Sequence, residues 1–363
     1  MGLYYYYTYL GVGDLEDYQL FYYFVKSERN SENDPLMLWL TGGPLSFNYE
    51  NSSRDSVTLQ LNPYSWTKRL LTHAKSLANP LYIGGDSYSG KIVPIVVQKV
   101  SNGIEVGSEP TMNLKGYILG NPVTTDKKDL NYRIEYAHRL TLLSDRIYQW
   151  TKRNCNGDYI DVDPDNQLCL NDLKVVDECI GKVSLEHVLL PNCPGSDAYE
   201  GNVIGFHVGK KQTCKLDKRA YSNIWMNYAE VQKALRIREG TKTSWVRCNR
   251  TIPYTKDVLS TLPYHRNLTH KFLRALIYSG DHDMTIPYLS THAWIKSLDL
   301  GIEDDWRPWF SDDDQVAGYT MRYTNKKYHL TFATVKGGGH TAPEFNPKEC
   351  FNMIDRWLAY SIL

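Results

Sequence analysis

Five apolar runs in the sequence predict buried strands, because each run is short and ends at glycines or polar residues. They lie within residues 35–44, 81–83, 114–122, 274–283 and 330–340. Short apolar runs of this kind are typical of parallel strands that are buried on both faces. Residues 18–28 are rich in tyrosine, phenylalanine and other strand formers, and predict a further strand.

Two helices are predicted from apolar residues at helical spacing. The helix after the run at 81–83 should bury one face made of Ile92, Val93, Val96, Val97 and Val100. The last helix is predicted at residues 347–358, with Asn346 as its N-cap and Pro347 at its first position. The residues of this helix expected to face the core are Phe351, Ile354, Trp357 and Leu358.

The order of these elements predicts an α/β fold with a mostly parallel central sheet and an inserted cap. We assign residues 1–123 and 252–363 to the core, and residues 124–251 to the cap, which holds most of the cysteines. Residues 45–80 are polar and weakly patterned, with only a short helical stretch at 68–78. A sheet of this type needs another strand and crossover at that point. We therefore expect the core to lack them.

The apolar run at 81–83 leads into Gly85-Asp-Ser-Tyr-Ser-Gly90, which the predicted helix follows. A strand, a sharp turn and a helix around Gly-x-Ser-x-Gly form a nucleophile elbow, in which a strained serine is exposed above a sheet. Ser89 stands in place of the second glycine and is small enough to fit the turn. Serine and glycine are common in ordinary turns, so the motif alone is weak evidence.

An acid and a base follow Ser87 in the order that α/β-hydrolases use. The run at 274–283 ends in Asp281 and Asp283, and the run at 330–340 ends in three glycines and His340. Serine is a poor nucleophile alone; a histidine takes its proton, and a buried aspartate fixes the imidazole tautomer. Each residue would be ordinary by itself. Their order at three strand ends predicts a triad of Ser87, His340 and one of the two aspartates.

The composition of the chain limits the classes of binding partner and the cellular compartment that we expect. The 41 basic and 41 acidic residues balance, which gives no electrostatic reason to expect nucleic acid or an anionic membrane surface as a partner. The seven cysteines lack zinc-type pair spacing, so we expect no metal site. The cysteines and three sequons, at Asn51, Asn249 and Asn267, indicate an oxidising compartment. Residues 1–10, in contrast, have no features of a signal peptide, and no apolar run is long enough to span a membrane.

With these motifs placed, the chain resembles the plant serine carboxypeptidase-like family almost throughout. The matching motifs are Leu38-Trp-Leu-Thr-Gly-Gly-Pro44, Gly85-Asp-Ser-Tyr-Ser-Gly90, Gly120-Asn-Pro122, Tyr278-Ser-Gly-Asp-His-Asp283 and Gly337-Gly-Gly-His-Thr-Ala-Pro-Glu344. The resemblance implies an α/β-hydrolase with Ser87 as nucleophile, Asp283 as triad acid and His340 as base. It also implies that Gly43 and Tyr88 supply the oxyanion-hole amides, and that no metal or organic cofactor is needed.

Two positions point to one branch of this family. Carboxypeptidases of the family usually place Glu before the nucleophile and Asn before the glycine pair, where they hold the terminal carboxylate of a peptide. Here these positions are Asp86 and Thr41, which we expect to bind substrate together with Gly42. The motif around Asp86 resembles the acyltransferases, which pass an acyl group from a glucose ester to an alcohol in secondary metabolism. The alternatives are a carboxypeptidase acting on peptide C-termini and a catalytically impaired, shortened member of the family.

The chain also departs from the family pattern. The Gly-Gly-Pro turn is usually followed by Gly-Cys-Ser-Ser, and here by Leu45-Ser-Phe47; the strand and helix usual before the elbow are reduced to residues 67–79. The missing cysteine would leave Cys248 without its usual partner. The resemblance implies disulfides Cys155–Cys169 and Cys193–Cys214, with Cys179 and Cys350 spare. It further implies a vacuolar or extracellular glycoprotein, with glycans at the three sequons and no protein partner.

Overall fold

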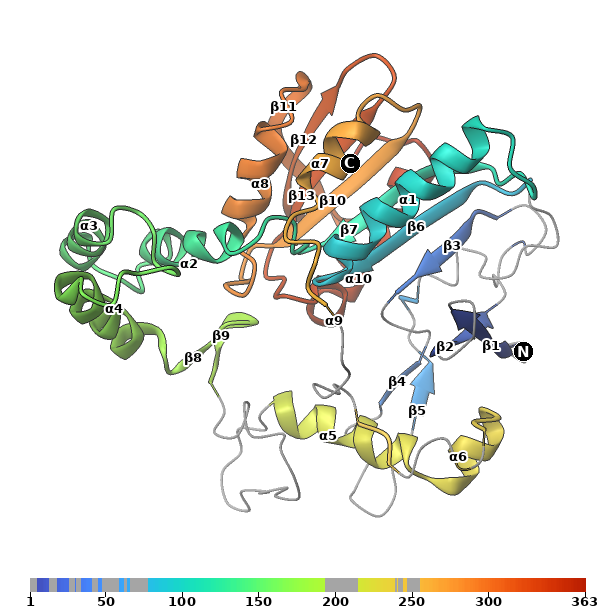
Figure 1. Cartoon of the computed structure of the whole chain (residues 1–363), viewed down its shortest axis with the longest axis horizontal. Helices are drawn as coiled ribbons and strands as arrows, with labels where there is room; N and C mark the ends of the chain where they lie inside the picture. The colour runs from blue at the N-terminus through green and yellow to red at the C-terminus, as the bar shows by residue number, and fades with distance from the viewer. Residues whose placement is uncertain are drawn as a thin grey trace. The chain divides into compact units, whose positions relative to one another are not determined.

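The computed structural model describes residues 5–12, 18–25, 30, 34–40, 45–47, 59–61, 64–65, 78–192, 215–238, 240, 244–246 and 255–363. They belong to two compact units. The larger unit comprises residues 32–42, 74–192 and 257–363, and the smaller unit comprises residues 1–31, 43–73 and 193–256. Each unit is described by itself below, with the element labels of Figure 1.

A seven-stranded sheet forms the centre of the larger unit, in the order β11-β12-β13-β10-β7-β6-β3 (Figure 1). The parallel strands are β3 (Leu36–Trp39), β6 (Leu81–Asp86), β7 (Leu114–Gly120), β10 (Arg274–Gly280) and β13 (His329–Val335). The antiparallel strands are β11 (Gly301–Phe310) and β12 (Val316–Thr324). The five predicted runs are thus the five parallel strands, and the predicted mostly parallel α/β sheet is confirmed.

The sequence analysis did not predict strands β11 and β12. Strand β11 is charged and largely exposed, with Glu303, Asp304 and Asp305 in succession, so it carries no continuous apolar run. Its pairing with β12 also shifts register three times, which interrupts any regular alternation of apolar and polar residues. An edge hairpin of this kind leaves a weak signal in the sequence.

Helices cover both faces of the sheet. They are α1 (Ser89–Glu105), α7 (Leu262–Leu268), α8 (Tyr288–Lys296), α9 (Ala342–Phe345) and α10 (Pro347–Leu358). In strand β6, Ile83 belongs to the core cluster that includes α1, whereas the ring of Tyr82 packs edge-on against Trp357 of α10, with ring centroids 5.3 Å apart. Successive strand residues point to opposite faces. Helices α1 and α10 therefore lie on opposite sides of the sheet.

The predicted helix faces are largely as expected. Val93 and Val97 of α1 are fully buried, but Ile92 is 41 % exposed, because a helix lying on a sheet buries only a stripe of its surface. On α10, Ile354 and Trp357 are buried as predicted. The predicted cap of this helix is wrong in one respect. Asn346 stands at the N-cap position, but its side chain makes no capping hydrogen bond.

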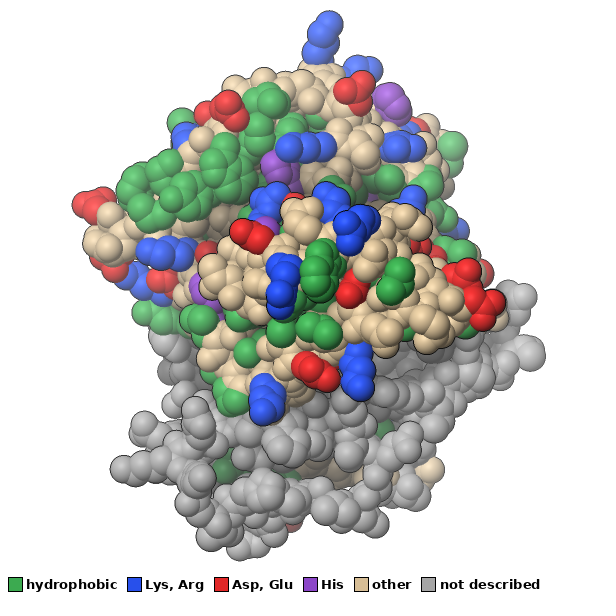
Figure 2. All heavy atoms as spheres, turned by 90° about the vertical axis from the view of Figure 1, so that its left-hand side faces the viewer, with side chains coloured by type: hydrophobic (Ala, Val, Ile, Leu, Met, Phe, Trp, Pro, Cys, Tyr) green, Lys and Arg blue, Asp and Glu red, His purple; other side chains and the backbone are tan. Residues whose placement is uncertain are grey.

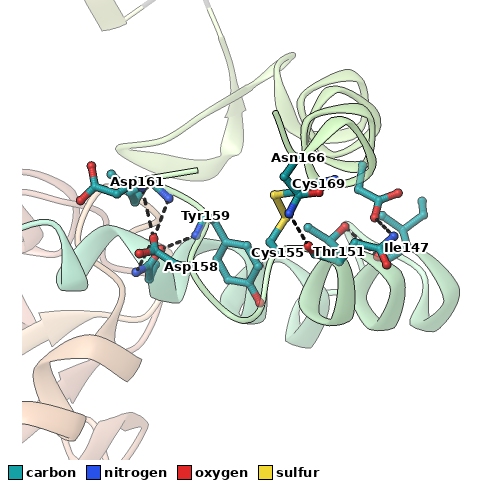
Figure 3. Close-up of a disulfide and its surroundings, with 12 residues drawn as sticks. Ile147, Thr151, Cys155, Asp158, Tyr159, Asp161, Asn166 and Cys169 are labelled. Carbon is teal, nitrogen blue, oxygen red and sulfur yellow. Dashed lines mark hydrogen bonds between the residues drawn. A yellow bond between two sulfur atoms is a disulfide. The ribbon is translucent and has the colours of Figure 1, made fainter. Parts of the chain in front are cut away.

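The segment after β7 forms a helical group that shares a small core with Met284 and Leu289 from the loop after β10 and from α8. Its elements are α2 (Lys128–Arg139), α3 (Asp145–Asn154), α4 (Gln167–Ile180), β8 (Val183–Ser184) and β9 (His187–Pro191). A disulfide between Cys155 and Cys169 joins the end of α3 to α4, as predicted, and Asn166 caps α4 beside it (Figure 3). The assignment of residues 124–251 to one cap stays a prediction.

The described residues of the smaller unit form two strand pairs and two helices. Antiparallel pairs form between β1 (Tyr5–Val12) and β2 (Tyr18–Val25) and between β4 (Leu45–Phe47) and β5 (Leu59–Leu61). The helices are α5 (Lys215–Met226) and α6 (Ala229–Ala234). Strand β2 was predicted, whereas β1, which contains most of the N-terminal tyrosine cluster, was not. The predicted helical stretch at 68–78, apart from residue 78, and the Cys193–Cys214 pair lie outside the described residues.

Strand β3 is the terminal strand of the large sheet within the described part of the chain. It pairs with β6 on one side, and Leu38 is 47 % exposed, so the full burial predicted for this strand is wrong. A strand with one neighbour leaves part of its side chains and backbone groups uncovered. On the face that carries α3 and α4, Figure 2 shows basic and acidic side chains interspersed.

Candidate active site

Ser87 occupies the tight turn between strand β6 and helix α1. Its φ angle is +55°, in the left-handed region that L-residues seldom adopt. Three backbone hydrogen bonds hold it there: Ser87 N–H donates to Gly120 O at 2.9 Å, and its own carbonyl accepts from Gly90 N at 3.0 Å and Val123 N at 2.9 Å. The neighbouring loops therefore stabilise the strained turn, and the structure has the elbow that the sequence predicted.

Close packing explains the small residues of the elbow. A Cβ atom on Gly85 would lie 2.4 Å from Ser89 Oγ, and one on Gly90 would lie 2.5 Å from the carbonyl oxygen of Val123. Ser89 is itself 4 % exposed, so a side chain of this size does fit at the position where the motif usually has glycine. The departure from Gly-x-Ser-x-Gly therefore leaves the turn intact.

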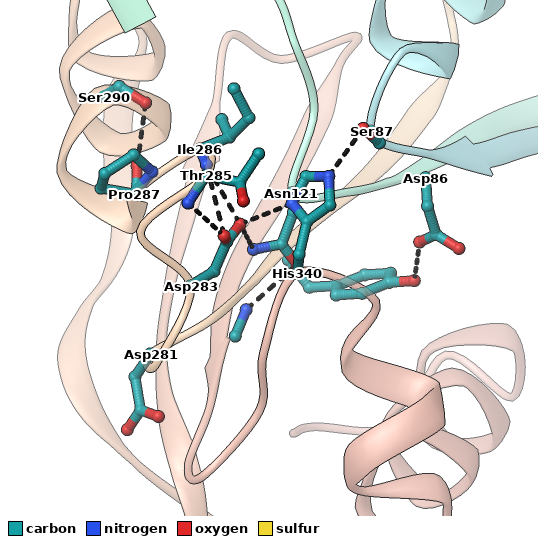
Figure 4. Close-up of polar contacts among 12 residues, drawn as sticks. Asp86, Ser87, Asn121, Asp281, Asp283, Thr285, Ile286, Pro287, Ser290 and His340 are labelled. Carbon is teal, nitrogen blue, oxygen red and sulfur yellow. Dashed lines mark hydrogen bonds and ion pairs between the residues drawn. The ribbon is translucent and has the colours of Figure 1, made fainter. Parts of the chain in front are cut away.

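His340 lies between Ser87 and Asp283 (Figure 4). Its Nε2 is 2.7 Å from Ser87 Oγ, and its Nδ1 is 2.8 Å from Asp283 Oδ2. Because a carboxylate oxygen only accepts, Nδ1 carries the proton, and Nε2 is left to accept from the serine hydroxyl. This geometry can activate a serine nucleophile.

The three side chains come from the carboxyl ends of three parallel strands. Ser87 follows β6, Asp283 follows β10 and His340 follows β13, and ligand sites of open α/β sheets lie at this edge. Strand β7 lies between β6 and β10 and ends at the same edge, just before Asn121. The order of strands in the sheet thus brings together residues that are up to 253 positions apart.

Asn121 is a site residue that the sequence analysis did not assign. Its Nδ2 donates to Asp283 Oδ2 at 2.7 Å, and its Oδ1 accepts from Gly280 N at 3.2 Å. It is fully buried with a φ of +41°, a conformation that asparagine tolerates better than most residues. Asn121 therefore fixes the same carboxylate oxygen that accepts from His340. Its place in the Gly120-Asn-Pro122 motif was the available signal.

The loop that carries Asp283 is held from several sides. Asp283 Oδ1 accepts from Thr285 N at 2.7 Å, and the side chain is fully buried. Helix α2 contributes two donors, since Arg133 Nη2 donates to Thr285 O at 2.9 Å and Tyr136 OH donates to Asp281 O at 2.5 Å. The helical group after β7 therefore supports the acid loop directly.

The pKa of His340 is raised above its usual value. Burial of the ring acts to lower this pKa, but the charge of Asp283 and its hydrogen bond raise it, with further contributions from Glu186 and Asp86, and the net shift is upward. The protonated imidazole is thus stabilised in this environment. The imidazole of His340 therefore loses its proton at a higher pH than an ordinary histidine does.

The other predicted site residues are placed as follows. Asp281 does not contact His340, and its side chain points away from the imidazole in Figure 4. Asp86 is 7 % exposed and accepts from Tyr278 OH at 2.7 Å. Tyr88 begins α1 next to Ser87 and is 52 % exposed. Thr41, Gly42 and Gly43 lie outside the described residues, as do Asn51 and Asn249, whereas Asn267 is exposed at the end of α7.

Neither a metal cluster nor a membrane-spanning helix is found in the described part of the chain. No group of three or more histidine, cysteine, aspartate or glutamate side chains there could hold a metal ion. None of the described helices is long and apolar enough to cross a membrane.

Comparisons with known proteins agree with this geometry. The family model described as Serine carboxypeptidase matches residues 3–71 and 68–360. The chain belongs to this family. Serine carboxypeptidase-like 17 and Serine carboxypeptidase-like 10 of Arabidopsis thaliana are each 40 % identical to it over 97 % of its length, which covers 88 % and 90 % of those proteins. Membership implies an enzyme of the hydrolase and acyltransferase type.

A solved structure of the family confirms the fold. The crystal structure of Kex1(delta)p, a prohormone-processing carboxypeptidase from Saccharomyces cerevisiae, matches 98 % of the chain and 91 % of its own length. The TM-score is 0.69 at 14 % sequence identity. A likeness at this identity is one of fold, and it supports the α/β-hydrolase architecture predicted from the order of the strands.

The comparisons also locate an interruption in the chain. The family model matches in two pieces that meet at residues 68–71. The alignment to Serine carboxypeptidase-like 17 extends over 406 positions, although the chain has only 363 residues, so the relative carries segments that have no counterpart here. The break in the family match falls where the sequence pattern was thin.

Proposed function

We propose that this protein transfers an acyl group from a glucose ester to an alcohol, through an acyl-enzyme on Ser87. The observation that carries the proposal is the chain of two short contacts, Ser87 Oγ to His340 Nε2 at 2.7 Å and His340 Nδ1 to Asp283 Oδ2 at 2.8 Å. A serine with a base and an oriented carboxylate in line is the arrangement that acyl transfer requires.

The reaction has two half-steps that share one base. In the first, Ser87 Oγ attacks the ester carbonyl while His340 Nε2 takes the hydroxyl proton; the C–O bond to glucose then breaks, and His340 returns the proton to the leaving sugar hydroxyl. In the second, the acceptor alcohol gives its proton to His340 and attacks the acyl carbon. Ser87 leaves and recovers that proton. No oxidant, metal or cofactor is consumed.

The proposed oxyanion hole consists of two backbone amides. The amide of Tyr88 lies directly after the nucleophile, at the start of α1, where its dipole also favours negative charge. Gly43 would supply the second amide from the turn after β3, outside the described residues. Each donor would act on the oxygen of the tetrahedral intermediate, where removal of one donor typically costs about a hundredfold or more in rate.

The environment of Asp86 supports acyl transfer over peptide hydrolysis. A carboxypeptidase must hold the terminal carboxylate of a peptide close to the nucleophile, next to the acidic residue that precedes the serine. Here that residue is the shorter aspartate, which is buried and already accepts from Tyr278 OH at 2.7 Å. We assign Asp86, with Thr41 and Gly42, to the binding of the ester substrate.

The carboxypeptidase reaction is retained as the second candidate because the same acyl-enzyme can react with water, and because the relatives carry that name. A third candidate is an inactive protein, which the interruption at residues 68–71 supports.

Members of this family typically reside in the secretory pathway or the vacuole. We propose such a compartment here, on the disulfide Cys155–Cys169, with Asn267 as a glycan site exposed on α7.

The test begins with the nucleophile. The purified chain is incubated with a fluorophosphonate and digested, and the adduct is located by mass spectrometry. We expect one adduct, on Ser87, and none in Ser87→Ala. Wild-type protein that unfolds cooperatively yet takes up no reagent would identify an inactive scaffold. Fresh, unlabelled protein is then given a panel of glucose esters with alcohol acceptors, and a panel of peptides. New esters support acyl transfer, whereas released C-terminal amino acids identify a carboxypeptidase.

A further inference from the structure

The backbone segment that carries the base of the site is rich in glycine and therefore intrinsically flexible. His340 follows Gly337, Gly338 and Gly339, and Gly337 has a φ of +75°. Glycine loses more conformational freedom on folding than any other residue. A glycine tripeptide cannot by itself keep an imidazole 2.7 Å from a serine hydroxyl. The loop must therefore be fixed by groups outside it.

Two side chains hold the backbone of Gly337. Its N–H donates to Asp281 Oδ1 at 2.7 Å, and its carbonyl oxygen lies 3.1 Å from His187 Nε2. The tautomer of His187 follows from its other contact, since Leu189 N donates to His187 Nδ1 at 3.3 Å. With Nδ1 accepting, the proton is on Nε2, which donates to Gly337 O. Both polar groups of one glycine are thus held by side chains from other elements.

His187 and Asp281 are also linked to each other through His282. The ring of His187 stacks on His282, with centroids 5.2 Å apart and planes 18° apart, and lies 4.5 Å from the ring of Phe345. His282 Nδ1 is 2.6 Å from the Asp281 oxygen that holds Gly337, and its backbone N–H donates to Gly338 O at 2.8 Å. His187 is 7 % exposed. These contacts join the acid loop, the base loop and strand β9 into one packed group.

We propose that His187 and Asp281 are positioning residues that clamp Gly337 and thereby fix the loop carrying His340. The proposal rests on the proposed function, in which His340 is the base. Neither residue contacts Ser87, so neither is itself catalytic. The turn between β8 and β9 completes the arrangement, because Glu186 O accepts from His340 N at 2.7 Å and Leu185 O accepts from Met284 N at 2.8 Å. The β8–β9 pair therefore supports both loops of the site.

The decisive variant is His187→Phe, which keeps an aromatic ring for stacking but removes the donor to Gly337 O. Two readouts are measured: hydrogen–deuterium exchange of the peptide covering residues 337–340, and the second-order rate of fluorophosphonate labelling at Ser87. We expect at least tenfold faster exchange, and labelling about 10- to 100-fold slower, because small displacements of a catalytic group cost that much. The pH at half-maximal labelling should also change.

The matched control is His292→Phe. His292 also has one ring stack, on Phe332 at 5.3 Å, and one polar contact, to Tyr323 OH at 3.0 Å, but contacts no part of the site. We expect it to lower thermal stability as much as His187→Phe does while leaving exchange and labelling at residues 337–340 and Ser87 unchanged. Equal effects of the two variants would reduce His187 to a general packing role and overturn the proposal.

A second pair of variants tests the other half of the clamp and does not depend on His187→Phe folding. Asp281→Asn keeps an oxygen that can accept from Gly337 N, whereas Asp281→Ala has none. We expect the alanine variant to show the faster exchange and slower labelling, and the asparagine variant to recover most of both. Equal behaviour of the two would also overturn the clamp.

Failure of the clamp and failure of the proposed function give different results. If wild-type Ser87 takes up no fluorophosphonate, the proposed function fails, and exchange at residues 337–340 still decides the clamp. If wild-type protein is labelled but exchange and labelling are the same in His187→Phe, the function stands and the clamp is refuted.

Discussion

Asp281 and Asp283 are two residues apart in one turn, yet their side chains have different partners. Asp283 bonds the imidazole of His340, and Asp281 bonds the backbone of Gly337. The strand pattern placed both aspartates at the edge of the sheet. It could not show which of them is the triad acid, because both directly follow β10. The distinction depends on contacts with residues far along the chain, and only the family motif pointed to Asp283.

The carboxylate of Asp283 should be essential for activating Ser87. In Asp283→Asn the amide can donate to Nδ1, which places the remaining ring proton on Nε2, facing Ser87, and removes the acceptor for the serine proton. We expect fluorophosphonate labelling to fall by about 10⁴-fold. The new amide nitrogen would also face the Asn121 Nδ2 donor, so thermal stability should fall as well. Labelling at a rate within tenfold of the wild type would show that His340 does not depend on Asp283.

The pH profile of the same reaction provides an independent check. The neutral imidazole is the reactive form, so labelling should rise with pH and reach half-maximum at the raised pKa of His340, above about 6.5. Asp283→Asn removes the charge that raises this pKa and leaves the burial that lowers it, so its midpoint should move down. A wild-type midpoint below the ordinary value would contradict this account.

Asn121 shows where reasoning from the sequence stopped. Its place at the end of a parallel strand was predicted, but a role for it was not. An asparagine before a proline at a strand end is an ordinary turn residue. The amide becomes functional only because β10 lies beside β7, so that Asp283 Oδ2 comes within 2.7 Å. That neighbour relationship is a property of the folded sheet.

Among the elements, helix α1 is fastened to its surroundings by Lys91 in its first turn. Lys91 is 9 % exposed, and its Nζ donates to three carbonyl oxygens: those of Thr124 and Thr125 at 3.2 Å each, and of Leu259 at 2.5 Å. Burial lowers its pKa, while Asp129 and Asp126 act to raise it. One ammonium group thus joins the helix that follows Ser87 to the segments after β7 and before α7.

Replacing Lys91 should loosen this junction. Lys91→Met keeps most of the side-chain volume but removes the Nζ donor from the carbonyl groups of Thr125 and Leu259, whereas Thr124 O still accepts from Thr261 N at 2.8 Å. We expect the free energy of unfolding to fall by about 2–3 kcal/mol, since each buried acceptor left unpaired costs on the order of 1 kcal/mol or more. Denaturant unfolding measures the loss. Lys99→Met, on the exposed side of the same helix, is the control and should change stability by less than about 0.5 kcal/mol.

Whether a helix or strand could be predicted from the sequence depended on how deeply it is buried. The five parallel strands were predicted because parallel strands covered by helices are apolar along most of their length. The β11–β12 pair and the exposure of Leu38 were missed, since edge positions depend on which neighbours are present. The side chain of Asn346 failed to cap α10 although its residue type and position were correct. Local preference does not determine the direction of a side chain.

At the scale of the whole molecule, the interruption at residues 68–71 should cost stability. We expect a chimera that receives the corresponding segment of Serine carboxypeptidase-like 17 to unfold at a higher denaturant concentration, with a larger m-value, because more surface is buried in the native state. A glycine–serine linker of equal length is the control and should add no stability. A chimera no more stable than this control would show that the shortened core is complete.

The position of β13 has a consequence for how the protein becomes active during synthesis. This strand lies between β10 and β12, both of which precede it in the chain, and His340 follows it at a distance of 253 residues from Ser87. The sheet cannot close until β13 inserts between strands that are already made. Contacts so distant in sequence form late. A nascent or truncated chain that ends before residue 340 therefore has Ser87 without its base. The serine stays unreactive until folding is nearly complete.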